Sequence, residues 1–184
     1  GDGDPAAGAA ATLIGGAGTV GMTLNGEFYD TAGATYQVAS GTIDVDRGSD
    51  GTTEFGLNNA AISFTGGNVN LANGTNLSIS TGNGAVSVPG IRANSSETVG
   101  ISTTGNISIG TGGIGSANQI NNVTLGAGTV LLSGDIVTDN NDGDVSITGA
   151  LSLSTNATIN TSAGNGSITI GTTVDGEKNL ILTS

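Results

Sequence analysis

Two short runs of acidic residues are the parts of this sequence whose residue types and spacing could bind a metal ion. The run DNNDGD contains Asp139, Asp142 and Asp144, and the run DVDRGSDG spans residues 44–51. Carboxylate oxygens close together in glycine-containing turns are the ligands that Ca²⁺ takes. A complete loop of the D-x-[DN]-x-[DN]-G type needs an acid at position 138, which is Thr138. A solvated turn is the preferred interpretation, and a calcium site at these three aspartates is kept as a hypothesis.

The composition contains few of the residue types that enzymes use for catalysis. The 184 residues include no His or Cys and only three Lys and Arg residues together, so acid–base and nucleophilic triads lack their parts. Asp44 and Asp46 fall on one face of an expected strand, in the manner of paired glycosidase carboxylates, but such pairs also occur on plain surfaces. We therefore expect no enzymatic activity and no cofactor other than the hypothetical calcium.

Charge and hydropathy exclude two classes of partner. Fifteen acidic residues against three basic ones give a net charge of −12, which repels phosphate backbones and anionic lipids. No run of 18 strongly apolar residues occurs, so no transmembrane helix is expected. We expect neither nucleic-acid binding nor membrane insertion. The absence of cysteine fits a protein of the cell surface or extracellular space that needs no redox control.

A repeat organises the chain. A glycine or small polar residue followed by alternating apolar residues recurs as GTVGMTL, GTIDVD, AAISFTG, GAVSVPG, GNISIGTG, NNVTLGAG, GDVSITG and GSITIG. The first apolar positions are Val20, Ile43, Ile62, Val86, Ile107, Val123, Val145 and Ile168, at spacings of 16 to 24 residues. The alternation predicts short strands with Ile, Val and Leu on one side and Ser, Thr and Asn on the other.

Short strands at this period favour an all-β fold of the right-handed parallel β-solenoid type. About eight loose rungs of about 21 residues would each bury their apolar side only by stacking on neighbours. The alternative is a jelly-roll-like β-sandwich pilin with donor-strand exchange, in which AAATLIGGAG at residues 9–18 would donate the strand. Sandwich strands are usually longer, and the corners here come closer together.

Three segments are expected along the chain. Residues 1–18 are predicted as a flexible or inter-subunit segment, residues 19–60 as irregular rungs or a cap, and residues 61–184 as regular solenoid repeats. The aromatic residues are concentrated near the second segment: Phe28, Tyr29, Tyr36, Phe55 and Phe64. They are expected either to pack over the open first rung, since terminal repeats are atypical, or to form an exposed surface that binds sugar rings or a subunit.

The stretches NGSITIGTTVDGEKNLILTS, DVSITGALSLSTNATINTSAGNG and GNISIGTGGIG resemble the repeats of filamentous-haemagglutinin-like bacterial exoproteins. The resemblance covers roughly residues 60–184 and implies a right-handed parallel β-solenoid, secreted to the cell surface and used for adhesion or fibre building. The asparagine-proline motifs of that family's secretion domain are absent, so the resemblance does not extend to two-partner export.

The expected function is structural. An uncapped apolar rung is expected at each end, with Leu13 and Ile14 at one and Leu180 and Leu182 at the other. Such ends would stack head to tail, on another copy or on the next repeat of a longer chain, and a contact of this kind builds filaments. The chain is therefore predicted to be a subunit or segment of an extracellular surface fibre. The alternative is a cell-surface adhesin module that binds a glycan or a host surface.

Overall fold

The computed structural model describes residues 11–14, 21–24, 27–30, 33–38, 42–45, 51–93, 97–116, 119–138, 142–161 and 164–184. Every regular element in these ranges is a strand, and the strands pair in parallel. No helix long and apolar enough to cross a bilayer occurs within them. The predicted all-β parallel solenoid is therefore confirmed, and the sandwich alternative is wrong.

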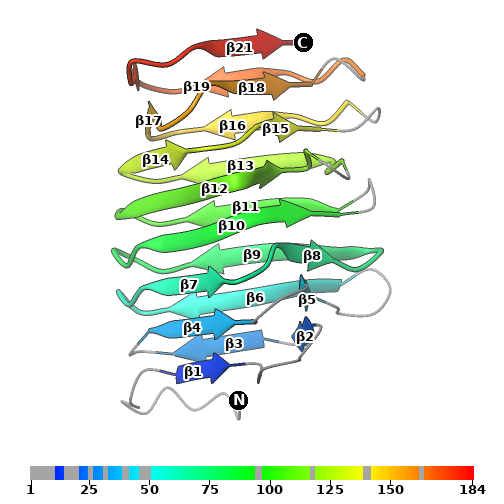
Figure 1. Cartoon of the computed structure of the whole chain (residues 1–184), viewed down its shortest axis with the longest axis vertical. Coiled ribbons are helices and arrows are strands. Elements are labelled where there is room, and N and C mark those ends of the chain that lie inside the picture. Colours follow the sequence, from blue (N-terminus) through cyan, green and yellow to red (C-terminus); the bar gives the residue numbers. More distant parts are fainter. Residues whose placement is uncertain are drawn as a thin grey trace.

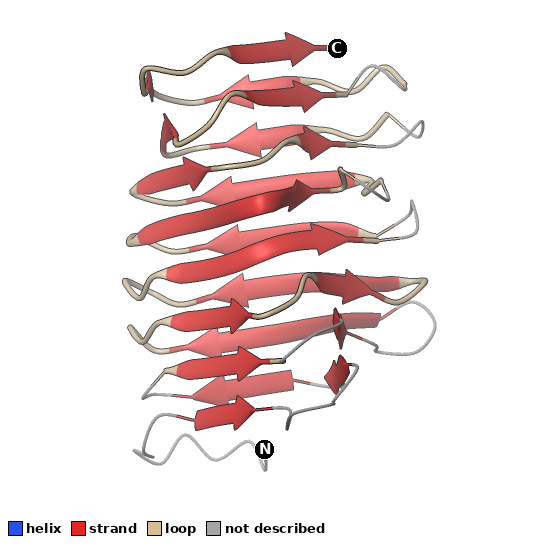
Figure 2. Cartoon of the chain, viewed as in Figure 1, coloured by secondary structure: helices blue, strands red, loops and turns tan. Residues whose placement is uncertain are grey.

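The strands form three faces of one coil, which Figures 1 and 2 show from the side. The first face contains β1 (Ala11–Ile14), β4 (Ala34–Gln37), β7 (Ile62–Thr65), β10 (Val86–Arg92), β12 (Asn106–Ile114), β14 (Thr129–Leu132), β17 (Ala150–Leu153) and β20 (Val174–Asp175). The second contains β2 (Gly21–Leu24), β5 (Thr42–Val45), β8 (Val69–Leu71), the ends of β10 and β12, β15 (Ile136–Val137), β18 (Ala157–Asn160) and β21 (Leu180–Thr183). The third contains β3 (Glu27–Asp30), β6 (Gly51–Leu57), β9 (Thr75–Ser80), β11 (Thr98–Ser102), β13 (Asn122–Gly126), β16 (Val145–Ile147) and β19 (Ile168–Ile170).

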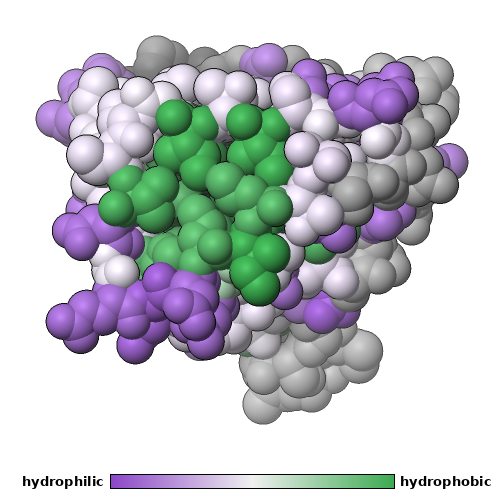
Figure 3. Space-filling view, turned by 90° about the horizontal axis from the view of Figure 1, so that it is seen from above, coloured by the Kyte–Doolittle hydropathy of each residue, from purple (hydrophilic) through white to green (hydrophobic). Residues whose placement is uncertain are grey.

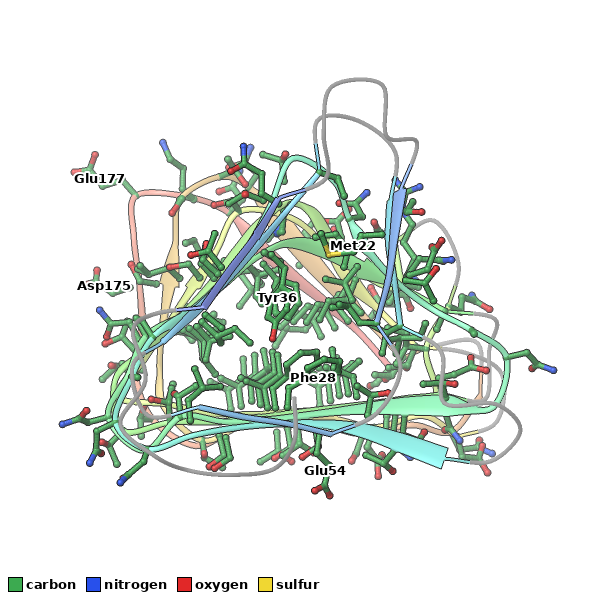
Figure 4. The ribbon with its side chains drawn as sticks, turned by 90° about the horizontal axis from the view of Figure 1, so that it is seen from below. Met22, Phe28, Tyr36, Glu54, Asp175 and Glu177 are labelled. Atoms are coloured by element: carbon green, nitrogen blue, oxygen red, sulfur yellow. The ribbon has the colours of Figure 1, made fainter. Side chains whose placement is uncertain are left out.

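The coil is right-handed. In Figure 1 the front strands run to the right and the rear strands to the left while the chain climbs from its N-terminus to its C-terminus. One turn, which we call a rung, passes through the first, second and third faces in that order. Seen along the axis in Figure 4, the three faces enclose the inward side chains. The right hand is the one that parallel crossover connections between L-residue strands favour.

Register-matched residues form continuous columns, which we call ladders. On the second face the inward ladder is Met22, Ile43, Val69, Ile91, Ile114, Ile136, Ile159 and Leu182. From Ile43 to Ile159 these side chains are 0% exposed. Identical or similar aliphatic groups stacked at about the 4.8 Å strand spacing leave little empty space between rungs.

The repeat positions predicted from the sequence do not all belong to one face. Ile62, Val86 and Ile107 lie on the first face, whereas Val123 and the two later positions lie on the third. The true partner of Ile107 is Val130, 23 residues on. The predicted spacing of 16 residues after Ile107 was therefore wrong, because it joined two strands of one rung.

The aromatic rings lie inside the first rungs. Phe28 stacks on Phe55 with ring centroids 4.9 Å apart and planes at 10°, and Tyr36 stacks on Phe64 at 5.2 Å and 20°. The two stacks meet edge to face, with Tyr36 and Phe55 centroids 5.5 Å apart. Phe55 and Phe64 are each 1% exposed, and Figure 4 shows Phe28 and Tyr36 pointing into the coil. The exposed aromatic surface is wrong for these four rings, which line the inside of the first rungs.

Threonine hydroxyls close two of the corners. Thr138 and Thr161 are 0% exposed, and their Oγ1 atoms donate to the carbonyls of Gly143 and Gly166 at 2.7 and 2.8 Å. These bonds satisfy buried hydroxyls and hold each corner against the rung. The corners are consequently built from repeated side-chain bonds as well as from backbone geometry.

The coil extends to the N-terminal side of residue 61, through the segment 19–60 that is expected to form irregular rungs or a cap. Strand β1 pairs with β4 and therefore belongs to the first face, although it falls within the segment 1–18. Strands β2 to β6 continue the three faces through much of residues 19–60. Residues 1–10 and 15–20 lie outside the described residues.

Candidate functional site

The C-terminal rung presents an apolar surface. Val174, Ile181 and Leu182 are 45%, 58% and 52% exposed, while Leu180 and Ile170 pack partly against the core. Figure 3, which views the molecule from the C-terminal end, shows this surface as a green area bordered by polar residues. We call it the C-terminal apolar surface. Contiguous apolar surface rimmed by polar residues is typical of interaction sites.

This exposure comes from position in the coil. Leu182 continues the ladder of Ile159, and Val174 continues that of Leu151. Ile159 and Leu151 are 0% exposed because another rung lies above them. Leu180 and Leu182 therefore occupy inward positions, as the sequence predicted, and Ile181 lies at an outward position beside Thr158.

The backbone of the same rung is paired on one side only. Among the described residues β19 pairs with β16, β20 with β17, and β21 with β18. The opposite edge of each strand carries the backbone groups that would bind a further strand. Backbone and side chains at this end thus offer what an additional rung needs.

The predicted interface residues at the other end are only partly described. Leu13 and Ile14 lie in β1, beside Tyr36 and Gln37 of β4. Strand β1 is the first strand of its face, so these residues sit on the N-terminal rung, as predicted. Their side chains lie outside the described part of the chain.

Two of the aspartates proposed as calcium ligands accept hydrogen bonds from the backbone of the next rung at a corner of the coil. Asp142 Oδ1 accepts the backbone N–H of Asn165 at 2.8 Å, and Asp144 Oδ1 accepts that of Ser167 at 2.7 Å. Asp139 lies outside the described residues. Within the described ranges no group of three or more His, Cys, Asp or Glu side chains is arranged to hold a metal. The calcium site stays a hypothesis, while the two carboxylates have a demonstrated role in joining rungs.

These two bonds belong to a recurring type of hydrogen bond between rungs that was not predicted from the sequence. Side-chain oxygens of Asn or Asp at a corner accept the backbone N–H of the residue 22 to 24 positions later, on the next rung. The pairs are Asn59 with Asn83, Asn76 with Thr98, Asn122 with Asp144, Asp135 with Thr158, Asp142 with Asn165, Asp144 with Ser167, and Asn156 with Asn179, at 2.7 to 3.2 Å. We call them the corner bonds. They satisfy N–H groups where the strand ladder is interrupted.

A buried carboxylate also links rungs. Glu97 is 0% exposed, and its Oε1 accepts the N–H of Gly74 on the rung below at 2.7 Å. Its own carbonyl accepts the N–H of Asn121 on the rung above at 2.9 Å. A charged or polar group in this position is retained only with such bonds, so Glu97 has a structural role.

Asp144 also makes the stability of the upper rungs depend on pH. Two hydrogen bonds, from the backbone N–H of Ser167 and from its hydroxyl, hold the pKa of Asp144 below its ordinary value of 3.8. A lowered folded-state pKa stabilises the fold above pH 3.8, and this contribution is lost as the pH falls through the folded-state pKa.

Asp144→Asn is accordingly expected to reduce the difference in unfolding midpoint between neutral pH and pH values below 3.8. The asparagine keeps an acceptor oxygen but does not titrate. Denaturant titrations followed by circular dichroism at the two pH values measure the effect. Ser167→Ala removes only the hydroxyl donor and should give an intermediate result; an unchanged difference in Asp144→Asn would contradict the assignment.

Hollows also occur on the side of the coil. One hollow, where the third face meets the first, is lined by small residues such as Ser102, Thr104, Gly126 and Thr148. Such a lining supplies single hydrogen bonds but no aromatic platform of the kind that stacks on ligand rings. The described aromatic rings lie inside the coil, so they do not provide the glycan-binding surface that the adhesin alternative required.

The fold and its ladders define the chain as a right-handed parallel β-solenoid. No protein-family model, curated protein or solved structure matches it. The relation to filamentous-haemagglutinin-like repeats accordingly stays a resemblance of sequence.

Proposed function

We propose that this chain is a structural subunit or segment of an extracellular surface fibre, in which solenoid rungs stack head to tail. The observation that carries the proposal is the C-terminal apolar surface, where Leu182 and Val174 are about half exposed at positions that are buried in the rungs below. An exposed apolar rung requires cover to stay soluble, and a further rung supplies that cover with the same kind of strand pairing as the rungs already present.

Charge supports growth along the axis. The net charge of −12 opposes side-by-side clumping, and exposed acids such as Glu54, Asp135 and Asp142 lie on the outer surface. Figure 4 shows Glu54, Asp175 and Glu177 pointing away from the coil. The apolar end is therefore the preferred contact, and a non-closing contact of two different ends gives a filament. An adhesin function has less support, since the described aromatic rings lie inside the coil.

The test is assembly of the purified chain. Wild-type protein is expected to form filaments with increasing concentration, whereas Leu180→Lys combined with Leu182→Lys should remain monomeric, because burying two ammonium groups without partners is strongly unfavourable. Sedimentation and electron microscopy measure both. The matched control is Thr111→Lys with Thr124→Lys, which adds the same charge at exposed positions on middle rungs and should still assemble.

Two results would overturn the proposal. One is a wild-type chain that stays monomeric at high concentration. The other is a Leu180→Lys, Leu182→Lys variant that forms the same filaments as the wild type while circular dichroism shows both to be folded.

A further inference from the structure

The two ends of the coil continue the same ladders. On the second face the inward ladder starts at Met22 and ends at Leu182, and on the third face a ladder starts at Phe28 and ends at Ile170. All four side chains are apolar, and each lies on a terminal strand of its face in the described residues. A rung placed above the C-terminal end in the existing register would therefore set Met22 over Leu182. The third face has one strand fewer than the other two in the described residues, so Phe28 would lie two strand spacings from Ile170 and would not contact it.

The outward ladder of the second face is continuous in the same way. Thr23 lies beside Asp44 at the N-terminal end, and Thr183 lies beside Asn160 at the C-terminal end. Both threonines are exposed. Neighbouring threonines on adjacent strands make favourable pairs, so this register brings no charge or bulky group into conflict on the outer side.

The corner bonds help to specify the register between one rung and the next. Asn165 and Asn179 occupy the upper positions of two corner bonds, each donating its backbone N–H to Asp142 or Asn156 below. In the rungs below, side chains of this type at these corners accept an N–H from above, and both asparagines are exposed. Asn179, which precedes β21 on the second face, can offer its side-chain oxygen to the next rung, as Asn156 does.

We propose that β20 and β21, the last strands of the first and second faces, bind β1 and β2 of a second copy in parallel and in register. Met22 and Thr23 of the second copy then continue the ladders of Leu182 and Thr183, and Asn179 accepts a backbone N–H group of that copy. The inference rests on the proposed function and adds the partner and the register. Its support is continuity with the rung-to-rung interface that the chain already repeats along its length.

A contact between two C-terminal ends fits less well. It would lay strands antiparallel, whereas every described pairing is parallel, and it would place the acceptor side chain of Asn179 against that of the other copy. The rim carboxylates of Asp175 and Glu177 would also face their own kind, which is destabilising.

Cysteine cross-linking tests the register, because the chain has no cysteine of its own. Thr23→Cys and Thr183→Cys are prepared as separate proteins, mixed under assembly conditions and oxidised. Neighbouring strands are about 4.8 Å apart, within the Cα separation that a disulfide accepts. A disulfide dimer is expected in the mixture and in neither variant alone. Gln37→Cys, at an exposed position on the first face, replaces Thr23→Cys as the off-register control and should give no dimer.

The corner bond is tested in the same assay. Asn179→Ala in the Thr183→Cys protein is expected to lower the dimer yield about fivefold at limiting concentration, the loss that one hydrogen bond represents. Asn73→Ala, at an exposed turn far from the end, is the matched control and should leave the yield unchanged. Equal yields for both alanine variants would overturn the role assigned to Asn179.

The outcomes separate the two proposals. Dimers from Thr183→Cys alone would indicate a contact between two C-terminal ends and overturn the inference. Filaments seen by electron microscopy without dimers from the mixture would overturn the register and leave the proposed function standing. Absence of assembly by the wild-type chain would overturn the proposed function, and this inference with it.

Discussion

Phe55→Ala is expected to lower the free energy of unfolding by about 3–5 kcal/mol, the usual cost of removing a buried phenylalanine ring. Phe55 is 1% exposed and contacts three other rings, stacking on Phe28 and meeting Tyr36 and Phe64 edge to face. Each aromatic pair adds about 0.5–1.5 kcal/mol beyond area burial. The narrow coil leaves the neighbours little room to move into the cavity, so the cost should lie toward the upper end.

Urea unfolding followed by circular dichroism measures this change. Phe55→Leu is expected to cost much less, because leucine and isoleucine fill the same ladder on later rungs, as Leu125 and Ile147 do. Gln37→Ala, at an exposed outward position in β4, should change stability by no more than about 0.5 kcal/mol. A loss below about 1 kcal/mol for Phe55→Ala would contradict the internal aromatic stack.

Gly66→Ala is the second change with a large expected effect. Gly66 has φ +83, and a Cβ built on it would lie 1.8 Å from the carbonyl oxygen of Val38. The left-handed backbone costs an L-residue about 1–2 kcal/mol, and relieving the clash by moving backbone adds about 1–3 kcal/mol. We therefore expect a loss of about 2–5 kcal/mol in the free energy of unfolding.

Gly100→Ala is the matched control for this glycine. Gly100 lies in β11, and the nearest atom to an added Cβ is the carbonyl oxygen of Leu77 at 3.9 Å. Alanine there should be neutral or stabilise the fold by about 0.4–1 kcal/mol, because it restricts the unfolded chain. Similar losses for the two substitutions, measured by the same unfolding titration, would show that the corner at Gly66 has no special geometry.

Much of the core was predictable from alternation alone. In β9 the residues Thr75 to Ser80 alternate buried and outward positions along their length, and the apolar members are those the pattern assigns to the interior. Alternation suffices here because a strand has only two sides, and burial of Ile, Val and Leu selects one of them. The terminal positions of Leu180 and Leu182 followed from the same rule.

The assignment of strands to faces needed the structure. The segments around Ile107 and Val123 have similar sequence patterns, but Ile107 lies on the first face of the coil and Val123 on the third. Each rung contains several strands with the same alternation of apolar and polar residues, and the corners between them differ in length. The local sequence pattern therefore does not show to which face a strand belongs. Pairing between residues 21 to 28 positions apart, such as Val86 with Ile107 and Ala34 with Ile62, settles the register.

The roles of the polar residues were likewise undetermined by sequence. For Asp142 and Asp144 the sequence favours a solvated turn and also allows a calcium site, because carboxylates in a glycine-containing turn suit Ca²⁺. Their partners are backbone N–H groups of Asn165 and Ser167, one rung away. A carboxylate oxygen accepts a hydrogen bond from whichever donor the fold places next to it. For both aspartates that donor is a backbone N–H group 23 residues later in the sequence.

The sequence by itself determined that the chain forms short parallel strands with an aliphatic interior, that its surface is acidic, and that Leu180 and Leu182 take inward positions. These properties depend on residue type and on local alternation, which the unfolded chain already contains. Only the tertiary structure decided that the aromatic rings stack inside the first rungs, which residues share a ladder, and that Asn and Asp side chains join the corners. Those properties depend on contacts between residues about one rung apart, which exist only once the coil has closed on itself.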